Sequence, residues 1–272
     1  MAAQHQTIVP RPRFWTEPQW IDVAGTEIAY RREGVGEPTL FLHGAGFTRQ
    51  WLPFHAALAE HVDLICPDHP GMGETALPEW LDGMDDLVLH YDDLLDALGL
   101  EHAHVVGYSL GGWIAAELAA FFARRLRSLT LVTPVGLRVE GHSPAPIFHM
   151  SPEQLATTIF SDPTNMASVL PAPDDVEEII HGYTEAATIA RLAWERPHDL
   201  KLDRRLRRVG CPALVVCAED DRLVPGAIAE RYAELLPDAQ VETIARTGHA
   251  LIVERPEETA AAVAAFIEET SR

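Results

Sequence analysis

Positively charged residues are scarce in this sequence. Its 272 residues include 21 Lys and Arg against 41 Asp and Glu, which gives a formal net charge of -20 at pH 7. The acidic residues are spread over segments such as 82–96 and 254–269 rather than gathered in a tail. A charge of this sign repels phosphate backbones and anionic bilayers. Nucleic acid is therefore excluded as an expected partner, and the acidity is interpreted as a source of solubility.

Cysteine is also rare, and this excludes a disulfide framework. The three cysteines, Cys66, Cys211 and Cys217, are an odd number, and two of them lie inside apolar runs typical of buried strands. The sequence shows no metal-ligand spacing and no dinucleotide-binding fingerprint. We therefore expect free thiols in a reducing, cytoplasmic compartment, no metal site and no other cofactor.

Long hydrophobic runs are missing as well. No stretch of about 18 uncharged apolar residues occurs, so a membrane span is not expected. Residues 1–15 are of mixed polarity and include Pro10 and Pro12 without a continuous apolar segment. Neither a signal peptide nor a membrane anchor is predicted there.

The sequence does contain an alternation of short apolar runs and longer helical patterns. Hydrophobic residues make up 47% of the chain, which is enough for a sizeable core. A hairpin is predicted over 19–30, and further strands are predicted at 39–42, 62–66, 104–106, 129–132, 213–217 and 240–244. Strands that are separated by helices pair in parallel through right-handed crossovers. We therefore expect an α/β fold with one core-bearing domain.

The alternation then breaks after the strand at 129–132. The next stretch has no strand signal, and its helical patches are separated by proline-rich joints. Its apolar side chains must be buried against something, so we expect an ordered helical lid rather than a loose loop. The predicted division is a core of 1–132 and 200–272 and a lid of 133–199. A passive structural subdomain is the alternative.

The segment 105–112 predicts a strand, a tight turn and the start of a helix that continues through 113–120. Ser109 lies in the turn with its hydroxyl exposed, because small glycine neighbours let the strand and the helix approach closely. The helix N-terminus behind the serine favours negative charge. This pattern predicts a nucleophile elbow, with an ordinary strand-to-helix turn as the alternative.

A serine hydroxyl is a weak nucleophile, so it needs a base within hydrogen-bond reach and an acid that orients the base. Among 13 histidines, only His249 lies C-terminal to the acidic cluster at 219–221. Loops at the carboxyl ends of the strands converge on one face of an open α/β sheet. We therefore predict that Ser109, a carboxylate of this cluster and His249 meet there.

The chain resembles the α/β-hydrolase superfamily over nearly its whole length. The matching pieces are His43-Gly44-Ala45-Gly46, Asp68-His69-Pro70-Gly71-Met72-Gly73, Gly107-Tyr108-Ser109-Leu110-Gly111-Gly112, Glu219-Asp220-Asp221-Arg222-Leu223-Val224-Pro225 and Gly248-His249. The resemblance implies an eight-stranded, mostly parallel sheet flanked by helices, with the lid inserted after the sixth strand. It also implies that Ser109 is the nucleophile, His249 the general base and then acid, and Asp221 the orienting carboxylate. A displacement of the acid by one position is the alternative.

The resemblance further implies an oxyanion hole made by the backbone N–H groups of Ala45 and Leu110. His43 and His69 are interpreted as supports of their loops. Six residues in or beside the predicted site loops or the lid are candidate substrate contacts, with an ordinary core role as the alternative. They are Gly46, Phe47, Tyr108, Trp113, Trp194 and Val224.

Hydrolysis of an ester or a lactone through an acyl-enzyme on Ser109 is the expected reaction. Members of the superfamily that open epoxides or displace halide use aspartate at the nucleophile position, so the resemblance disfavours those reactions. The lid is rich in apolar residues and has few Lys and Arg. This composition suggests a small-molecule substrate that is largely uncharged or hydrophobic.

Two alternative functions stay open. Carbon–carbon bond hydrolases of the meta-cleavage type usually have tryptophan after the catalytic histidine and glycine-proline-glycine in the oxyanion loop. This chain has Ala250 after His249 and Phe47-Thr48 after Gly46, so that function comes second. A ligand-binding receptor built on the same fold is the other alternative. Formation of a homo-oligomer also stays open.

Overall fold

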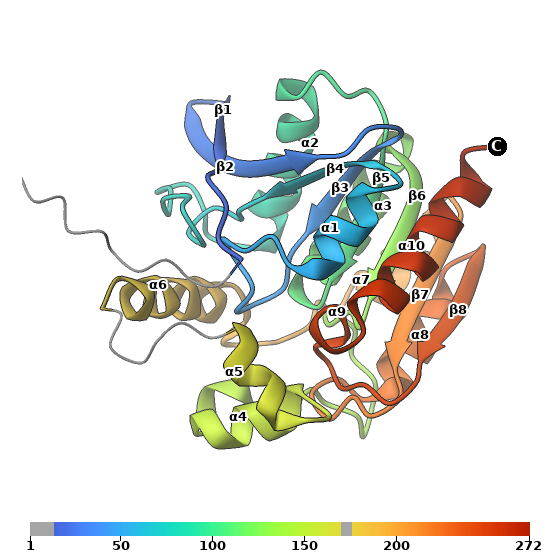
Figure 1. The fold of residues 1–272 in the computed structure, drawn as a ribbon. Helices are drawn as coiled ribbons and strands as arrows, with labels where there is room; N and C mark the ends of the chain where they lie inside the picture. The colour runs from blue at the N-terminus through green and yellow to red at the C-terminus, as the bar shows by residue number, and fades with distance from the viewer. Residues whose placement is uncertain (1–13, 170–175) are drawn as a thin grey trace, which may run out of the picture.

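The computed structural model describes residues 14–169 and 176–272, which surround one eight-stranded sheet (Figure 1). The strands are β1 (Gln19–Val23), β2 (Thr26–Glu33), β3 (Pro38–Leu42), β4 (Asp63–Pro67), β5 (Ala103–Tyr108), β6 (Leu126–Val132), β7 (Ala213–Ala218) and β8 (Ala239–Ile244). Their order in the sheet is β1-β2-β4-β3-β5-β6-β7-β8. β2 pairs antiparallel with β1 and β4, and the other neighbouring strands are parallel. The predicted mostly parallel α/β sheet is confirmed.

Helices cover both faces of this sheet. One face carries α1 (Pro53–Ala59), α9 (Leu251–Glu254) and α10 (Pro256–Thr270), and the other carries α2 (Met84–Ala97), α3 (Leu110–Phe121), α7 (Leu202–Leu206) and α8 (Gly226–Leu235). The chain enters β6 through the short 3-10 helix η1 (Ala123–Arg125). The result is a three-layer arrangement with the sheet in the middle.

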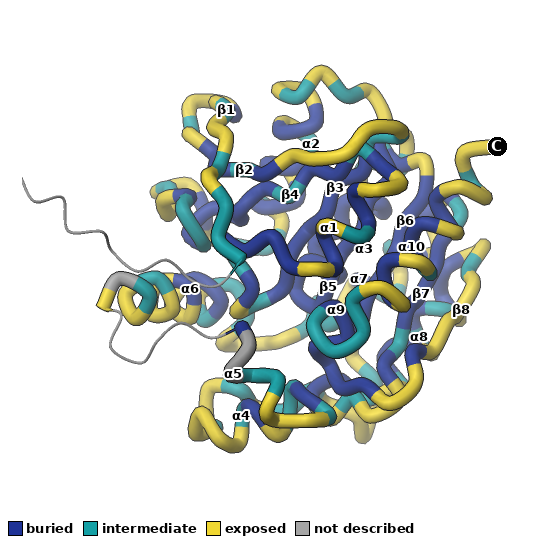
Figure 2. The backbone as a smooth tube through the Cα atoms, viewed as in Figure 1, coloured by how far each residue is buried: buried dark blue, intermediate teal, exposed yellow. Residues whose placement is uncertain are grey.

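The central strands are buried on both faces, and this explains why they are continuous apolar runs in the sequence. Val105 and Val215 pack with α2, α3, α7 and α8, whereas the next residues along each strand, Val106 and Val216, pack with α1, α9 and α10. Successive side chains of a strand point to opposite faces of the sheet. Figure 2 shows these strands as buried segments in the centre of the molecule. Alternating polar residues are therefore not needed here.

The first helix starts later than the sequence pattern predicts. An apolar side formed by Trp51, Leu52 and 54–57 predicts a helix from residue 48 to about residue 59, but α1 begins at Pro53, after Leu52 in an extended conformation with φ -65° and ψ 160°. Proline disfavours helical dihedral angles in the residue before it and fits the first helical position. The Nδ1 atom of His55 accepts the backbone N–H of Leu52 at 3.0 Å, which caps the helix.

Between β6 and α7 the chain leaves the sheet and forms a separate group of helices. These are η2 (Ile147–His149), α4 (Pro152–Ile159), η3 (Pro163–Asn165), α5 (Met166–Val169) and α6 (Val176–Ala193). Figure 1 shows α6 to one side of the sheet layers and α4 with α5 below them. The division into a core of 1–132 and 200–272 and a lid of 133–199 stays a prediction. In the part of the chain that the structure describes, no helix combines the length and the apolarity that crossing a bilayer requires.

Candidate active site

Ser109 lies in the sharp turn between β5 and α3. Its backbone has φ 53° and ψ -110°, a positive φ that residues with a side chain rarely adopt. A Cβ atom at Gly107 would lie 2.3 Å from the carbonyl oxygen of Gly111, and one at Gly111 would lie 2.0 Å from that of Leu42. Only glycine therefore lets α3 pack this closely on β5 and β3, and this packing holds the strained turn. The strand, turn and helix predicted over 105–112 are present.

His249 and Asp221 continue a chain of hydrogen bonds from Ser109. The Nε2 atom of His249 lies 2.9 Å from Oγ of Ser109, and its Nδ1 atom lies 2.9 Å from Oδ2 of Asp221. An ionised carboxylate only accepts hydrogen bonds, so Nδ1 carries the proton and Nε2 is free to accept the serine proton. Ser109 follows β5, Asp221 follows β7 and His249 follows β8. The carboxyl ends of three parallel strands thus bring the three groups together.

Asp221, and neither of its acidic neighbours, is the residue that contacts the imidazole. Asp220 is exposed, and Oε2 of Glu219 accepts the backbone N–H of Arg246. Ser109 is 8% exposed and His249 is 2% exposed. Hydrogen bonds that are shielded from water in this way are electrostatically stronger than exposed ones.

The loop after β3 passes directly beside Ser109. A Cβ atom at Gly44 would lie 3.0 Å from the Cβ atom of the serine. Ala45 and Leu110 both line the cavity in front of the serine hydroxyl. Leu110 is the first residue of α3, and the first N–H groups of a helix have no partner inside the helix. Two backbone N–H groups beside a nucleophile suit the binding of an oxyanion.

Two buried histidines brace this loop. The Nε2 atom of His43 accepts the backbone N–H of His69 at 3.0 Å, and Nε2 of His69 donates to the carbonyl oxygen of His43 at 2.8 Å. Nδ1 of His43 donates to the carbonyl oxygen of Gly44, and Nδ1 of His69 pairs with the hydroxyl of Tyr91. Burial lowers the pKa of both imidazoles. Both rings therefore stay neutral, and their contacts fit the supporting role that was predicted for them.

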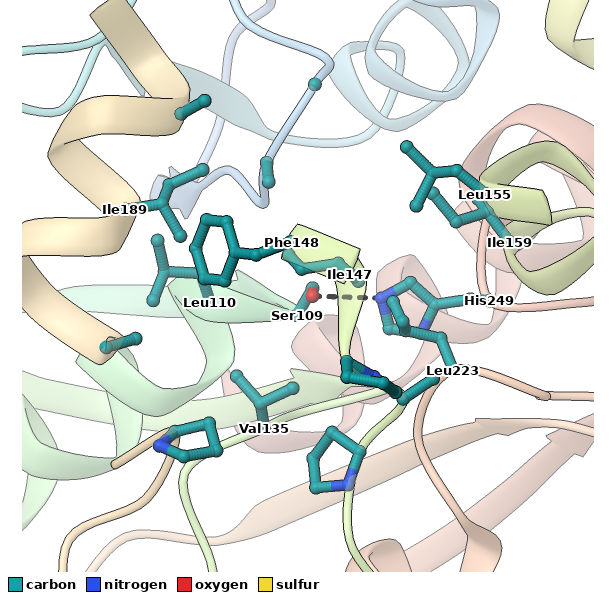
Figure 3. A pocket seen from close by; sticks show the side chains of 18 of the residues that line it. Ser109, Leu110, Val135, Ile147, Phe148, Leu155, Ile159, Ile189, Leu223 and His249 are labelled. Atoms are coloured by element: carbon teal, nitrogen blue, oxygen red, sulfur yellow. Dashed lines mark hydrogen bonds between the residues drawn. The ribbon is translucent and has the colours of Figure 1, made fainter. Parts of the chain in front are cut away.

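A cavity of about 470 Å³ opens in front of Ser109 (Figure 3). Its walls come from the core loops and from the helices between β6 and α7. Apolar side chains dominate the lining, and among the described residues that form it there is no Lys, Arg, Asp or Glu. Figure 3 shows several of them around the serine: Leu110, Val135, Ile147, Phe148, Ile189 and Leu223.

Five of the six predicted substrate contacts line this cavity. They are Gly46, Phe47, Tyr108, Trp113 and Trp194. The sixth, Val224, is 3% exposed, packs in the core cluster on the α3 side of the sheet and is not among the residues that line the cavity, so its contact with a substrate stays a prediction. Oδ1 of Asp221 accepts the backbone N–H groups of both Leu223 and Val224, at 2.9 and 2.8 Å. In this tight turn Leu223, rather than Val224, faces the cavity.

Glu254, which no pattern in the sequence marks as functional, connects the histidine loop to the helices between β6 and α7. Its carboxylate accepts the backbone N–H of Gly248 at 2.7 Å, of Ser161 at 3.1 Å and of Asp162 at 3.0 Å. Burial alone would raise the pKa of Glu254, but these hydrogen bonds outweigh it and lower the pKa. No spacing in the sequence marks this role, because two of the partners are backbone groups more than 90 positions away.

Glu185 is the second carboxylate that the sequence pattern did not reveal. It lies on α6, accepts the backbone N–H of Gly46 and the hydroxyl of Thr48, and is 7% exposed. Burial raises its pKa, although both hydrogen bonds oppose that effect. The helices between β6 and α7 therefore contact the loop after β3 as well as the histidine loop.

The cysteines stand apart from this site. Cys66, Cys211 and Cys217 are free. Burial raises the pKa of Cys211 and of Cys217 to about 11. Thiols with so high a pKa stay protonated near neutral pH and are poor nucleophiles. Within residues 14–169 and 176–272, no group of three or more His, Cys, Asp or Glu side chains could hold a metal ion.

Comparison with known proteins gives matches over most of the chain. The model of the alpha/beta hydrolase family matches residues 39–262. A 2-hydroxy-6-oxo-6-(2'-aminophenyl)hexa-2,4-dienoic acid hydrolase of Metapseudomonas resinovorans is 27% identical over 266 residues, which cover 92% of this chain and 90% of that protein. A protein of Caulobacter sp. (strain K31) that is assigned as a carbamate hydrolase is 30% identical over 238 residues, which cover 80% of this chain and 85% of that protein.

A similar structure is that of a membrane phospholipase A described as a bacterial virulence factor. It aligns with a TM-score of 0.79 and 25% identity over 94% of this chain and 87% of that chain. The names of these three proteins refer to three different kinds of substrate. The choice of substrate therefore has to be argued from the cavity.

Proposed function

We propose that this chain, which belongs to the alpha/beta hydrolase family, is a serine hydrolase that cleaves an ester or a lactone of a small, largely apolar and uncharged substrate. The observation that supports this most directly is the hydrogen-bonded set of Ser109, His249 and Asp221 at a cavity whose described lining has no charged Lys, Arg, Asp or Glu side chain. A neutral substrate enters such a cavity without burying an unpaired charge. The structural likeness to a phospholipase A fits an ester substrate.

In the proposed reaction, Oγ of Ser109 attacks the carbonyl carbon while its proton passes to Nε2 of His249. Asp221 keeps the imidazole in the required tautomer and stabilises the imidazolium. The backbone N–H groups of Ala45 and Leu110 bind the negative charge that develops on the carbonyl oxygen. His249 then gives the proton to the leaving alkoxide, which departs as an alcohol and leaves the serine acylated.

The second half of the reaction repeats these roles with water. His249 takes a proton from a water molecule, and the oxygen of that water attacks the acyl carbon. When the second tetrahedral intermediate collapses, His249 returns the proton to Oγ of Ser109 and the carboxylic acid is released. A lactone follows the same course, with the alcohol and the acid in one product.

The test compares a neutral ester with a matched anion. We expect p-nitrophenyl hexanoate to be hydrolysed with a kcat/KM at least about 100-fold higher than that of the p-nitrophenyl monoester of glutaric acid, because the described cavity lining has no Lys or Arg to pair with a buried carboxylate. Short-chain esters and γ-lactones complete the panel, and Ser109→Ala serves as the blank. If no neutral ester or lactone were turned over faster than by this blank, the proposed function would be wrong. A receptor would show at most a few slow turnovers.

Hydrolysis of a carbon–carbon bond is a second candidate, because a dienoic acid hydrolase is 27% identical over 92% of the chain. A dienoic acid carries a carboxylate, and no Lys or Arg is among the described residues of the cavity lining. We therefore place this function second. The decay of the absorbance of a 2-hydroxy-6-oxohexa-2,4-dienoate separates the two. A Ser109-dependent kcat/KM above that for every neutral ester would reverse their order.

A further inference from the structure

The Glu185 carboxylate reaches from α6 to the loop that carries Ala45. Its Oε1 atom accepts the backbone N–H of Gly46 at 2.5 Å, and its Oε2 atom accepts the hydroxyl of Thr48 at 2.8 Å. Glu185 does not line the cavity, whereas its neighbours Ala186 and Ile189 do. The carboxylate therefore acts on the loop and not on the substrate.

Two further polar contacts fix α6 on the core. The guanidinium of Arg49 forms ion pairs with Glu178 of α6 and with Glu74. The hydroxyl of Thr188 donates to the carbonyl oxygen of Gly71 at 2.8 Å. These contacts place α6 against the core, but neither of them involves the peptide between Ala45 and Gly46. Among the three contacts, only that of Glu185 does.

The Gly46 N–H belongs to the peptide unit that joins Ala45 to Gly46. Because a peptide unit is planar, an acceptor that holds this N–H also holds the Ala45 carbonyl and restricts ψ of Ala45. Gly46 has φ +86°, and a Cβ atom built on it would meet nothing within 4 Å. Such a glycine in open space has wide conformational freedom, so the loop needs a contact from outside to stay in one conformation.

Building on the proposed hydrolytic function, we propose that Glu185 is a positioning residue of the oxyanion hole. Its carboxylate holds the Ala45–Gly46 peptide so that the Ala45 N–H keeps the orientation needed to bind the carbonyl oxygen of the substrate. The helix α6 and the oxyanion hole are thereby coupled through one side chain. A glutamine at this position keeps a carbonyl oxygen for the Gly46 N–H and an amide that can donate to Thr48, whereas leucine offers neither.

The test measures kcat and KM separately for wild type and three variants with a neutral ester as substrate. We expect Glu185→Leu to lower kcat by about 10- to 100-fold with KM changed by less than about twofold. A displaced oxyanion donor stabilises the transition state less, whereas the binding of the substrate in its ground state hardly changes. Glu185→Gln should keep kcat within about threefold of wild type. Thr188→Val is the matched control on the same helix, because it removes a contact of α6 that does not involve the oxyanion loop, and its kcat should stay within about twofold.

Several results would overturn the proposal. An unchanged kcat in Glu185→Leu, an equal loss in Glu185→Gln, or an equal loss in Thr188→Val would show that the carboxylate does not position the loop. If Glu185→Leu does not fold, Thr48→Val is the test in its place, because it removes the hydroxyl that donates to one oxygen of the Glu185 carboxylate. Its kcat should then fall by about threefold or more with KM unchanged, and an unchanged kcat would overturn the proposal.

The wild-type chain separates this proposal from the proposed function. If it turns over no ester, the proposed function fails by itself. The role of Glu185 is then measured by the rate at which a fluorophosphonate labels Ser109, since that reaction also places negative charge in the oxyanion hole. Glu185→Leu should slow the labelling by about tenfold or more, and an unchanged rate would overturn the proposal.

Discussion

The Nε2 atom of His249 lies 2.9 Å from Oγ of Ser109, although the two residues are 140 positions apart in the sequence. Groups that pass one proton between them act as a unit, so the decreases in kcat caused by replacing each group alone do not multiply when both are replaced. Ser109→Ala and His249→Gln should each lower kcat for a neutral ester by at least about 10³-fold, and the double variant should be no slower than the single ones. Asp220→Asn, which alters an exposed carboxylate, is the control and should match wild type. Multiplied losses in the double variant would contradict a shared role.

The packing of α3 against the sheet predicts opposite outcomes for two glycines. Gly111→Ala forces a Cβ atom to within 2.0 Å of the Leu42 carbonyl oxygen, so we expect a loss of about 2 kcal/mol or more in the free energy of unfolding, together with lower activity. Gly182 lies inside α6 with nothing within 4 Å of a Cβ position, so Gly182→Ala should raise stability by about 0.5–1 kcal/mol. Urea unfolding measures both. Equal changes in the free energy of unfolding for the two variants would contradict the close approach of α3 to the sheet.

The described lining of the cavity has no Lys, Arg, Asp or Glu, so one added cation should change the substrate preference. Ala186 lines the cavity and is exposed, so arginine fits there without overpacking. Ala186→Arg should raise kcat/KM for the glutarate monoester relative to the hexanoate by about 10-fold, because the guanidinium pairs with the carboxylate. Ala187→Arg places the same charge on the same helix at an exposed residue that does not line the cavity. An equal change in both variants would mean that the long-range field, and not the cavity, sets the preference.

Buried histidines predict a loss of stability in mild acid. Burial lowers the pKa of His55 to about 3 and the pKa values of His90 and His104 to about 4. In the unfolded chain these groups take up protons near pH 6.5, so the unfolded state binds more protons as the pH falls from about 6.5 toward 4. The free energy of unfolding should therefore drop by up to about 1.4 kcal/mol per pH unit for each of the three.

Urea unfolding between pH 7.5 and pH 5 checks this dependence. His55→Gln should make this dependence less steep by the contribution of one histidine, because glutamine does not titrate and its oxygen can still accept the Leu52 N–H. His61→Gln changes an exposed histidine and should leave it as in wild type. A stability that does not change over this pH range would contradict the neutral state of the buried rings.

The sheet and the serine turn could be predicted because local patterns report them. A strand that is buried on both faces, such as β7, has to be a continuous apolar run, and a turn with a helix packed against a strand needs glycine at positions like Gly107 and Gly111. The grouping of Ser109 with His249 and a carboxylate of 219–221 followed from one topological rule, that loops at the carboxyl ends of parallel strands share one face, and the resemblance to the α/β-hydrolase superfamily selected Asp221 within that cluster. Each of these signals is contained in neighbouring residues or in strand order.

The rest depended on contacts that no local pattern contains. Glu185 meets the Gly46 N–H across 139 positions, and a glutamate in a helix normally indicates only a solvated face. Leu223 lines the cavity and Val224 does not, and this difference is a property of the folded turn, in which Oδ1 of Asp221 accepts both backbone N–H groups. The late start of α1 was visible in principle, because Pro53 favours the first position of a helix.

The proposed function depends above all on Ser109 as the nucleophile. The most direct measurement is the reaction of the full chain with a fluorophosphonate, followed by mass spectrometry of the labelled peptides. One label per chain on Ser109 is predicted, absent in Ser109→Ala and formed far more slowly in His249→Gln. A label on another residue, or hydrolysis of neutral esters that continues while Ser109 stays unlabelled, would contradict the claim.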